Sequence, residues 1–253
     1  MIQLPSEPKL VSRTGNRAVF EISPLYPGYG MTIGNTLRRV LISSLEGAAV
    51  TSAKIKGVDH EFSAIPGVAE DVIEIILNLK KIRFRVFKDE PVTVTLSAKK
   101  EGEVTAGDIK TTSDIEVINK EQHIATITDK KTELEMEITV ERGVGYVPVE
   151  QRHKGKLSVG EIAIDGIFTP IKNVNFTVEN IRVGQRTDYN KVLMDVETDG
   201  SISPEEAIKR ASQILIEHFA IINSIAVPEE TKPSVEAKPK RGRKKKEKED
   251  ETL

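Results

Sequence analysis

The stretch GYGMTIGNTLRRVLISSLEG, residues 28–47, decides the fold of this chain, because it leads three glycines directly into an apolar helix. The glycines are spaced like a phosphate-binding loop, but Ile33 stands where the dinucleotide fingerprint G-x-G-x-x-G requires its third glycine. The fingerprint also follows a buried strand, whereas the preceding residues 24–27, PLYP, predict a turn. The stretch therefore favours a docking helix over a nucleotide site.

Two helices are predicted in the first third of the chain. Apolar residues at helical spacing predict a helix that follows Gly34 and stops at Gly47. A second helix is expected over residues 68–79, where the apolar residues fall on one side. The acidic pairs Glu70–Asp71 and Glu205–Glu206 are expected in the first turns of helices, where negative charge complements the helix dipole.

A third helix, expected to run to Val227, has the clearest start signal. Ser203 can cap it, Pro204 suits the first helical position, and Glu206 completes an S-x-x-E capping box. Its apolar residues form two rows, namely Ile208, Ala211, Leu215, Phe219 and Ile222, and Ala207, Ile214, Ile221 and Ile225. So wide an apolar arc must be covered on more than one side. The chain's own core could cover it, but the few aromatic residues elsewhere favour a partner chain.

Strands outnumber helices in the remaining sequence. Period-2 alternation is clearest at Leu134, Met136, Ile138 and Val140, which predicts a strand with one buried face. Further strands are expected at residues 19–22, 50–56, 82–86, 92–96, 114–118, 174–183 and 192–196. Together these elements predict the α+β class.

Composition excludes several kinds of site. The chain of 253 residues contains no cysteine, which rules out disulfides, thiolate nucleophiles and thiolate-bound zinc. Its four histidines lack metal-ligand spacing, and no nucleophile or phosphate-loop motif is present, so neither a metal, a cofactor nor a catalytic residue is expected. No apolar run approaches the ~18 residues that span a bilayer, and residues 1–10 do not resemble a signal peptide, so we expect an intracellular, soluble protein.

Residues 228–253 differ in composition from the rest. Sixteen of these twenty-six residues are charged, three are proline and none is aromatic, which predicts a disordered tail. Nine of the charges are basic and seven acidic, so the tail carries +2 and the remainder of the chain −4. The net charge of the body therefore gives no argument for broad binding to nucleic acid.

Several long blocks carry a resemblance to a known family. The blocks are GYGMTIGNTLRRVLISSLEGAAVTSAKIKGVDHEF (28–62), GVAEDVIEIILNLK (67–80), ERGVGYVPVEQ (141–151) and VGQRTDYNKVLMDVETDGSISPEEAI (183–208). Together they resemble the N-terminal assembly domain of the alpha subunit of bacterial and plastid RNA polymerase. The resemblance implies a cytoplasmic, non-catalytic homodimer without cofactors. It also implies that the large catalytic subunits, beta and beta prime, assemble on this dimer.

The resemblance also implies an architecture and a dimer interface. Residues 1–46 and 172–227 would form a dimerisation subdomain with a mixed sheet and two packed helices, interrupted by residues 47–171 as a mostly-β inserted subdomain. The first and third helices would pack against their dimer mates. We assign the dimer-facing positions to Leu37, Val40, Leu41, Leu215, Phe219 and Ile222.

Other residues are carried over as contacts to the large subunits. The arginine pair of the first helix lies in the region that receives beta, so Arg38 and Arg39 are candidates, with Arg39 preferred. The planar fork of arginine suits such a contact, because it can bind carboxylates or carbonyls through two donors. His60 and Glu61 belong to the same implied surface, and Lys80 is the candidate on the beta prime side.

The resemblance ends before the charged tail. The family usually continues into a small helical domain that binds promoter DNA, and this chain is expected to lack it. The segment KPKRGRKKK, residues 238–246, has seven basic residues in nine, so Lys240, Arg241, Arg243 and Lys244 are candidates for electrostatic contact with DNA.

Two other classes of protein remain as alternatives. A free-standing enzyme with a mixed sheet would need a pocket with converging titratable groups. A DNA-binding protein driven by its basic tail would lose its function when the tail is removed.

Overall fold

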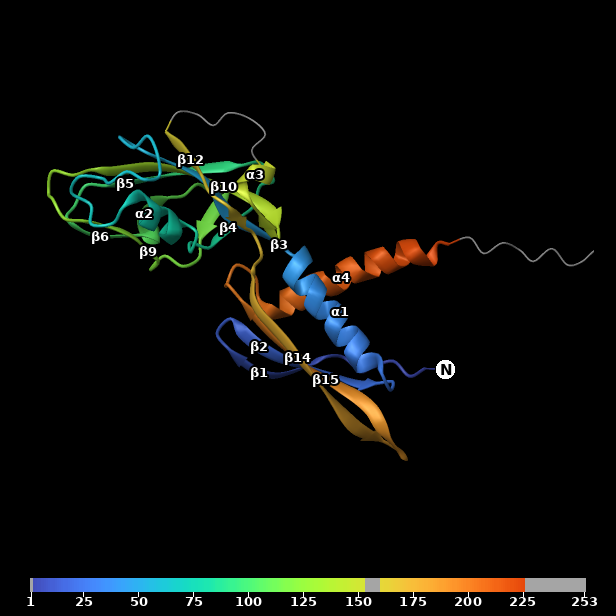
Figure 1. Ribbon diagram of the computed structural model, residues 1–253. Coiled ribbons are helices and arrows are strands. Elements are labelled where there is room, and N and C mark those ends of the chain that lie inside the picture. The colour runs from blue at the N-terminus through green and yellow to red at the C-terminus, as the bar shows by residue number, and fades with distance from the viewer. Residues whose placement is uncertain (1, 153–159, 226–253) are drawn as a thin grey trace, which may run out of the picture.

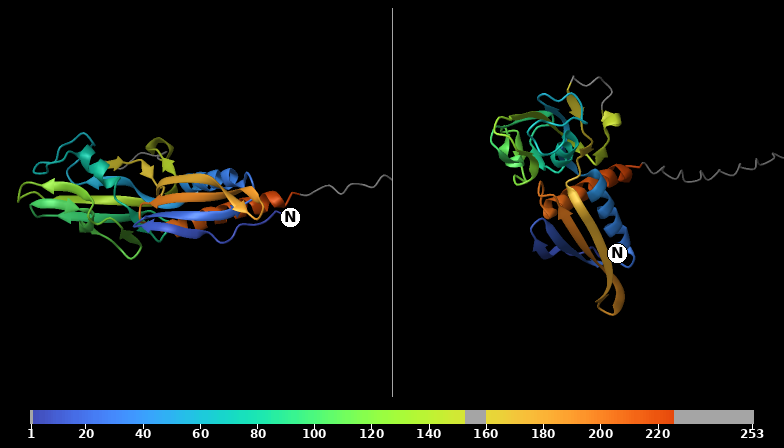
Figure 2. Two further views of the ribbon diagram at one scale, coloured as in Figure 1. Left: turned by 90° about the horizontal axis from the view of Figure 1, so that it is seen from below. Right: turned by 60° about the vertical axis from the view of Figure 1, so that its left-hand side comes forward.

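The computed structural model describes residues 2–152 and 160–225, which form two halves that lie end to end (Figure 1, Figure 2). The helix–sheet half consists of β1 (Lys9–Thr14), β2 (Arg17–Leu25), α1 (Tyr29–Ser44), β14 (Ile171–Val183), β15 (Arg186–Thr198) and α4 (Pro204–Asn223). The insert half consists of β3 (Glu46–Ile55), α2 (Val72–Leu79), β4 (Phe84–Val86), β5 (Val92–Ala98), β6 (Gly102–Thr105), a 3-10 turn (Ala106–Asp108), β7 (Ile109–Lys110), β8 (Ile115–Val117), β9 (His123–Ile127), β10 (Leu134–Val144), β11 (Tyr146–Val147), α3 (Val149–Arg152), β12 (Glu161–Ala163) and β13 (Gly166–Ile167).

The helix–sheet half is a four-stranded sheet with α1 and α4 packed on it. The strand order is β1-β2-β15-β14, and alternate residues of β2 and β15 are buried beneath the helices. The α+β class is confirmed. The expected mixed sheet is wrong in one respect, because every strand pair in this sheet is antiparallel. The short hairpins that join β1 to β2 and β14 to β15 impose that direction, since a parallel pair needs a long crossover.

The glycines of the opening stretch let α1 lie directly on β14. A Cβ added at Gly34 would lie 2.5 Å from Cδ2 of Phe176, and one at Gly30 would lie 2.7 Å from Cγ1 of Val178. Both glycines lie inside α1, because the helix begins at Tyr29 and not after Gly34 as predicted. The glycines serve close packing between a helix and a strand, which answers why a phosphate-loop pattern appears here without its fingerprint.

The N-terminus of α1 is capped from a distant strand. Gly28 occupies the N-cap position with φ of 86° and has no side chain to offer. The side-chain Oδ1 of Asn190, on β15, accepts hydrogen bonds from the backbone N–H groups of Gly28 at 2.9 Å and Gly30 at 3.3 Å. This contact fixes the start of α1 on the sheet, because it satisfies donors that the helix itself cannot satisfy.

The insert half has its own core around a five-stranded sheet of order β12-β3-β10-β5-β7. The alternating residues of β10 point into that core, as their spacing predicted. Helix α2 packs on β9 and starts at Val72, later than the predicted Val68. The delay has a local reason, since Val68 pairs with Ile127 as an isolated β-bridge and Asp71 caps the helix by accepting from the Glu74 N–H at 2.7 Å.

Helix α4 begins as predicted. The Oγ of Ser203 accepts from the Glu206 N–H at 3.1 Å, and Pro204 is the first helical residue. Within the described residues the helix ends at Asn223, and the predicted end at Val227 lies outside them. Helix α1 ends at Ser44, and Gly47, the predicted stop, belongs to β3.

Candidate protein-binding surfaces

The second half of α4 leaves the core and presents apolar side chains to solvent. Its first turns are anchored, since Pro204, Ala207 and Ala211 are buried. Every residue from 216 to 225 is exposed, and in Figure 1 this part of the helix projects past α1. We call the large apolar residues of this segment the α4 apolar face, which consists of Ile216, Phe219, Ile221, Ile222 and Ile225. An apolar patch of this kind is typical of a protein-binding surface.

The six residues assigned to the dimer interface fall into two groups. Leu37 and Leu41 are buried in the core of their own chain, and Leu41 has no exposed surface at all. The single chain already encloses these two side chains, so their contact with a partner stays a prediction and the main contact is expected elsewhere. Val40 and Leu215 are half-buried. Phe219 and Ile222 are 59% and 56% exposed, and for these four residues the assignment stays a prediction.

The two arginines of α1 differ in what they contact. Nε of Arg38 donates to the carbonyl oxygen of Val174 at 3.2 Å, which ties that side chain to β14. Arg39 is exposed, and among the described residues its guanidinium has no hydrogen-bond or ion-pair partner. Three residues further along the helix, on the adjacent turn, lies Ile42, which is 42% exposed. Both arginines are exposed, but only Arg38 is bonded to its own sheet, so Arg39 is the one whose guanidinium is wholly free to bind a partner.

The other three candidates lie on the insert half, apart from the arginine pair of α1. His60 and Glu61 are exposed in the loop that follows β3, and His60 Nδ1 lies 3.1 Å from Oγ of Ser63. Phe62, next to them, is 77% exposed. Nζ of Lys80, in contrast, lies 3.2 Å from Oδ2 of Asp165, and its side chain is mostly buried. These residues are thus not gathered into a single cluster.

The carboxylate of Asp165 is itself well held. Burial disfavours its charged form, but the hydrogen bonds that it accepts from the Val149 N–H, at 3.2 Å, and from Lys80 outweigh burial and lower the pKa of Asp165. Asp165 thus remains charged at neutral pH and retains Lys80. The ammonium of Lys80 is therefore less available to another protein than the guanidinium of Arg39.

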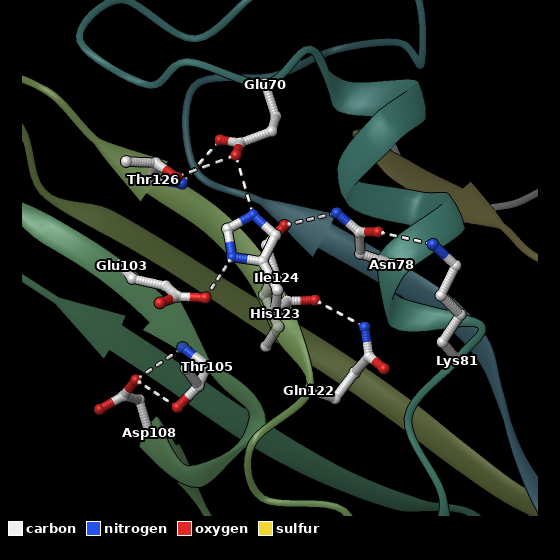
Figure 3. Close-up of polar contacts among 10 residues, drawn as sticks. All are labelled: Glu70, Asn78, Lys81, Glu103, Thr105, Asp108, Gln122, His123, Ile124 and Thr126. Atoms are coloured by element: carbon white, nitrogen blue, oxygen red, sulfur yellow. Dashed lines mark hydrogen bonds and ion pairs between the residues drawn. The ribbon is translucent and has the colours of Figure 1, made fainter.

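A polar cluster that sequence reasoning missed fastens the segment before α2 to β9 (Figure 3). Oε2 of Glu70 accepts from the Thr126 N–H at 2.6 Å, and Oε1 lies 2.9 Å from Nε2 of His123. Nδ1 of His123 lies 2.9 Å from Oε1 of Glu103. The prediction that Glu70 serves a helix first turn is wrong, because Asp71 caps α2 while Glu70 turns to β9. No motif or residue spacing in the sequence predicted this cluster.

Titration of this cluster makes stability depend on pH. The hydrogen bond to Glu70 outweighs burial and, with the bond to Glu103, raises the pKa of His123. Burial disfavours the charged form of Glu70, but the hydrogen bonds from Thr126 and His123 outweigh it and lower the pKa of Glu70. The contribution of His123 is therefore complete below its ordinary pKa of about 6.5 and is lost as pH rises through the higher pKa of the folded state. The contribution of Glu70 is instead lost as pH falls through its lowered pKa.

We expect His123→Gln to lower the free energy of unfolding near pH 6 by about 1 kcal/mol or less, the scale of exposed ion pairs, and to matter less near pH 9. Urea unfolding at both pH values measures the difference. His60→Gln is the matched control, because His60 lies on the same half and bonds a hydroxyl rather than a carboxylate. A loss in His123→Gln that is equally large at both pH values would contradict this assignment.

The structure bears on the remaining sequence predictions only in part. Lys240, Arg241, Arg243 and Lys244 lie outside the described residues, so their contact with DNA stays a prediction. In the described part of the chain, no helix is long and apolar enough to cross a membrane. Within the same residues, no group of three or more histidine or acidic side chains is placed to hold a metal ion.

Comparison with known proteins adds a consistent result. The family described as RNA polymerase Rpb3/RpoA insert domain matches residues 53–169. The DNA-directed RNA polymerase subunit alpha of Moorella thermoacetica is 54% identical over 202 residues, which cover 80% of this chain and 64% of that protein. The subunit of the same name from Flavobacterium psychrophilum is 49% identical over 226 residues, covering 87% and 68%. The chain thus spans about two thirds of the length of these relatives, and slightly less for the first.

Proposed function

This chain belongs to the family of DNA-directed RNA polymerase alpha subunits, and from that premise we propose that it is a non-catalytic assembly subunit of such a polymerase. Two copies form a homodimer, and the dimer recruits the beta and beta prime subunits. Residues 1–46 and 172–227 serve as the dimerisation subdomain, and residues 47–171 are inserted into it. The two separate buried clusters of the structure support this division.

The single observation that carries the proposal is the α4 apolar face. Four large apolar side chains on the last turns of α4, and Ile225 just beyond its end, have 56–74% of their surface exposed. Leaving such a patch in water is unfavourable, and a second copy of the chain can cover it symmetrically with the same patch. Val40 on α1 and Leu215 on α4 are both half-buried against the core and would extend the area toward the ~1,600 Å² of a standard interface.

The large-subunit contact is proposed to centre on Arg39. This residue combines a guanidinium without a partner among the described residues with one exposed apolar neighbour, Ile42, and arginine is enriched at binding hot spots. His60 and Glu61, with the exposed ring of Phe62, supply a second contact on the insert half. We assign a smaller role to Arg38 and Lys80, because Val174 and Asp165 already hold their charged groups.

Affinity purification of the tagged chain from its own cells tests the proposal. We expect two much larger proteins to be recovered in one copy each for every two copies of this chain, and the mixture to extend RNA on a DNA template. The chain purified alone should be a dimer without polymerase activity. Recovery of the chain as a monomer, or without two large partners, would overturn the proposal.

A further inference from the structure

The two halves are joined first by two crossings of the chain. One leads from α1 into β3, and the other leads from β13 into β14 through residues 168–170. The second crossing carries Phe168, whose ring lies under Gly143 and Gly166 and is 4% exposed. A Cβ added at Gly166 would lie 2.4 Å from Cε2 of that ring, so the crossing is closely packed.

A second connection lies away from the crossings, where strand β4 meets the loop before α4. Nε and Nη2 of Arg85 both donate to the carbonyl oxygen of Ser201, at 3.0 and 2.8 Å. Nε of Arg83 lies 3.7 Å from Oδ2 of Asp199, a carboxylate whose side chain is 8% exposed. Among the described residues, these two arginines make the polar side-chain contacts that bridge the halves outside the crossings.

The loop that receives the arginines also has hydrogen bonds of its own. Oδ1 of Asp199 accepts from the Ser201 N–H at 2.9 Å and from the Ser201 hydroxyl at 2.6 Å. The Asp199 N–H in turn donates to the carbonyl oxygen of Pro170 at 2.9 Å. Ser203, the N-cap of α4, lies two residues after Ser201. A displacement of this loop would therefore also displace the start of α4.

Apart from the two crossings, the described residues offer few other contacts that could fix the angle between the halves. Their buried cores are separate clusters that share no residue. A cleft of about 440 Å³ separates them, lined by residues of both halves such as Ala48, Phe84, Ile202 and Arg210. Domains without a large shared apolar interface move relative to each other by default. The contacts of Arg85 with Ser201 and of Arg83 with Asp199 are therefore expected to determine the angle between the two halves.

We propose that Arg83 and Arg85 are positioning residues that hold the insert half at a fixed angle to the helix–sheet half. Arginine suits this role because its rigid fork places two donors on one acceptor, which a lysine cannot do. The fixed angle sets the distance between Arg39 on α1 and the His60–Glu61 loop. This last step rests on the proposed function, whereas the angle itself does not.

Spin labels can measure the angle directly, because the chain has no native cysteine. We would label the full chain at Glu101→Cys on the insert half and Thr187→Cys on the helix–sheet half, both exposed positions. Refolding with a large excess of unlabelled chain leaves most labelled copies paired with an unlabelled one. We expect one narrow distance in the parent protein and loss of that narrow distance in Arg83→Ala/Arg85→Ala.

Two variants keep this result interpretable. Arg17→Ala also removes an ion-paired arginine, but its partner Asp195 lies in the same sheet, so the narrow distance should persist. Arg85→Lys keeps the charge and should still broaden the distribution, even if the double variant does not fold. Labels at Ser12→Cys and Thr187→Cys, within one half, should report no change in any variant. A narrow, unshifted distance between the halves in folded Arg85→Lys or in the folded double variant would overturn the proposal.

Binding of purified beta to the same variants separates this inference from the proposed function. We expect the double variant to dimerise like the parent and to capture beta more weakly. If the halves become mobile and capture is unchanged, the angle stands and its bearing on assembly is overturned. If the parent dimer itself fails to capture beta, the proposed function fails while the spin-label result remains valid.

Discussion

Phe219→Asp is expected to turn the dimer into a folded monomer, whereas Leu41→Asp is expected to unfold the chain. Leu41 has no exposed surface, so a carboxylate there would be buried without a partner among apolar side chains. Such burial costs several kcal/mol, a large part of the ~5–15 kcal/mol that stabilises a typical domain. Phe219 is 59% exposed in the single chain, so aspartate costs little there until a second copy covers it.

Sedimentation velocity and circular dichroism distinguish these outcomes. The Phe219→Asp protein should sediment as a monomer with the helical signal of the parent, and Ile222→Asp should behave alike. Lys209→Asp, on an exposed part of α4 outside the apolar face, is the matched control and should stay dimeric. A Phe219→Asp protein that remains a dimer would place the interface elsewhere, and a stable Leu41→Asp protein would contradict the burial described for α1.

Arg39→Ala is expected to leave the dimer intact and to weaken capture of beta about thirtyfold. Truncation of an arginine at a hot spot typically costs about 2 kcal/mol, which corresponds to that change in affinity. Arg38→Ala is the matched control, since it is the same substitution at the preceding position of the helix. Because Arg38 bonds the Val174 carbonyl, its loss should lower the stability of the fold more than the affinity for beta.

Titration of labelled beta with each dimer measures both effects, and urea unfolding reports stability. Arg39→Lys should lie between the parent and alanine, because it keeps the charge but loses the two-donor fork. Equal affinity of Arg39→Ala and the parent for beta would remove Arg39 from the proposed contact. Greater loss in Arg38→Ala than in Arg39→Ala would reverse the assignment of the two arginines.

Features specified by neighbouring residues could be predicted from the sequence. The start of α4 follows from Ser203, Pro204 and Glu206, which act within one turn. The start of α1 could not be placed, because Gly30 and Gly34 are explained by Phe176 and Val178, far along the chain. Strand β9 was missed although Ile124, Ala125 and Ile127 are all buried, because two adjacent buried residues break the alternation that marks a strand.

The candidate surfaces show the same limit. Periodicity gave α1 and α4 similar apolar rows, and it could not tell which row faces the chain's own sheet. Burial separates Leu41 from Phe219 only once both helices are placed on β2, β14 and β15. The preference for Arg39 over Arg38 now has a physical reason, since Val174 occupies one arginine and not the other.

The pairing of β2 with β15 has a consequence for the order in which this protein matures during synthesis. Arg17 and Asp195, ion-paired across these strands, are 178 positions apart, and all of the insert half is translated between them. The insert half can therefore bury its core while β2 still waits for its central neighbour, since domains fold as they are synthesised. The sheet on which α1 packs is complete only after β15 has been synthesised. Helix α4, which carries the α4 apolar face, follows β15 in the chain. If two copies associate through the α4 apolar face as proposed, nascent chains on neighbouring ribosomes lack that surface, and association should follow the near-completion of each fold.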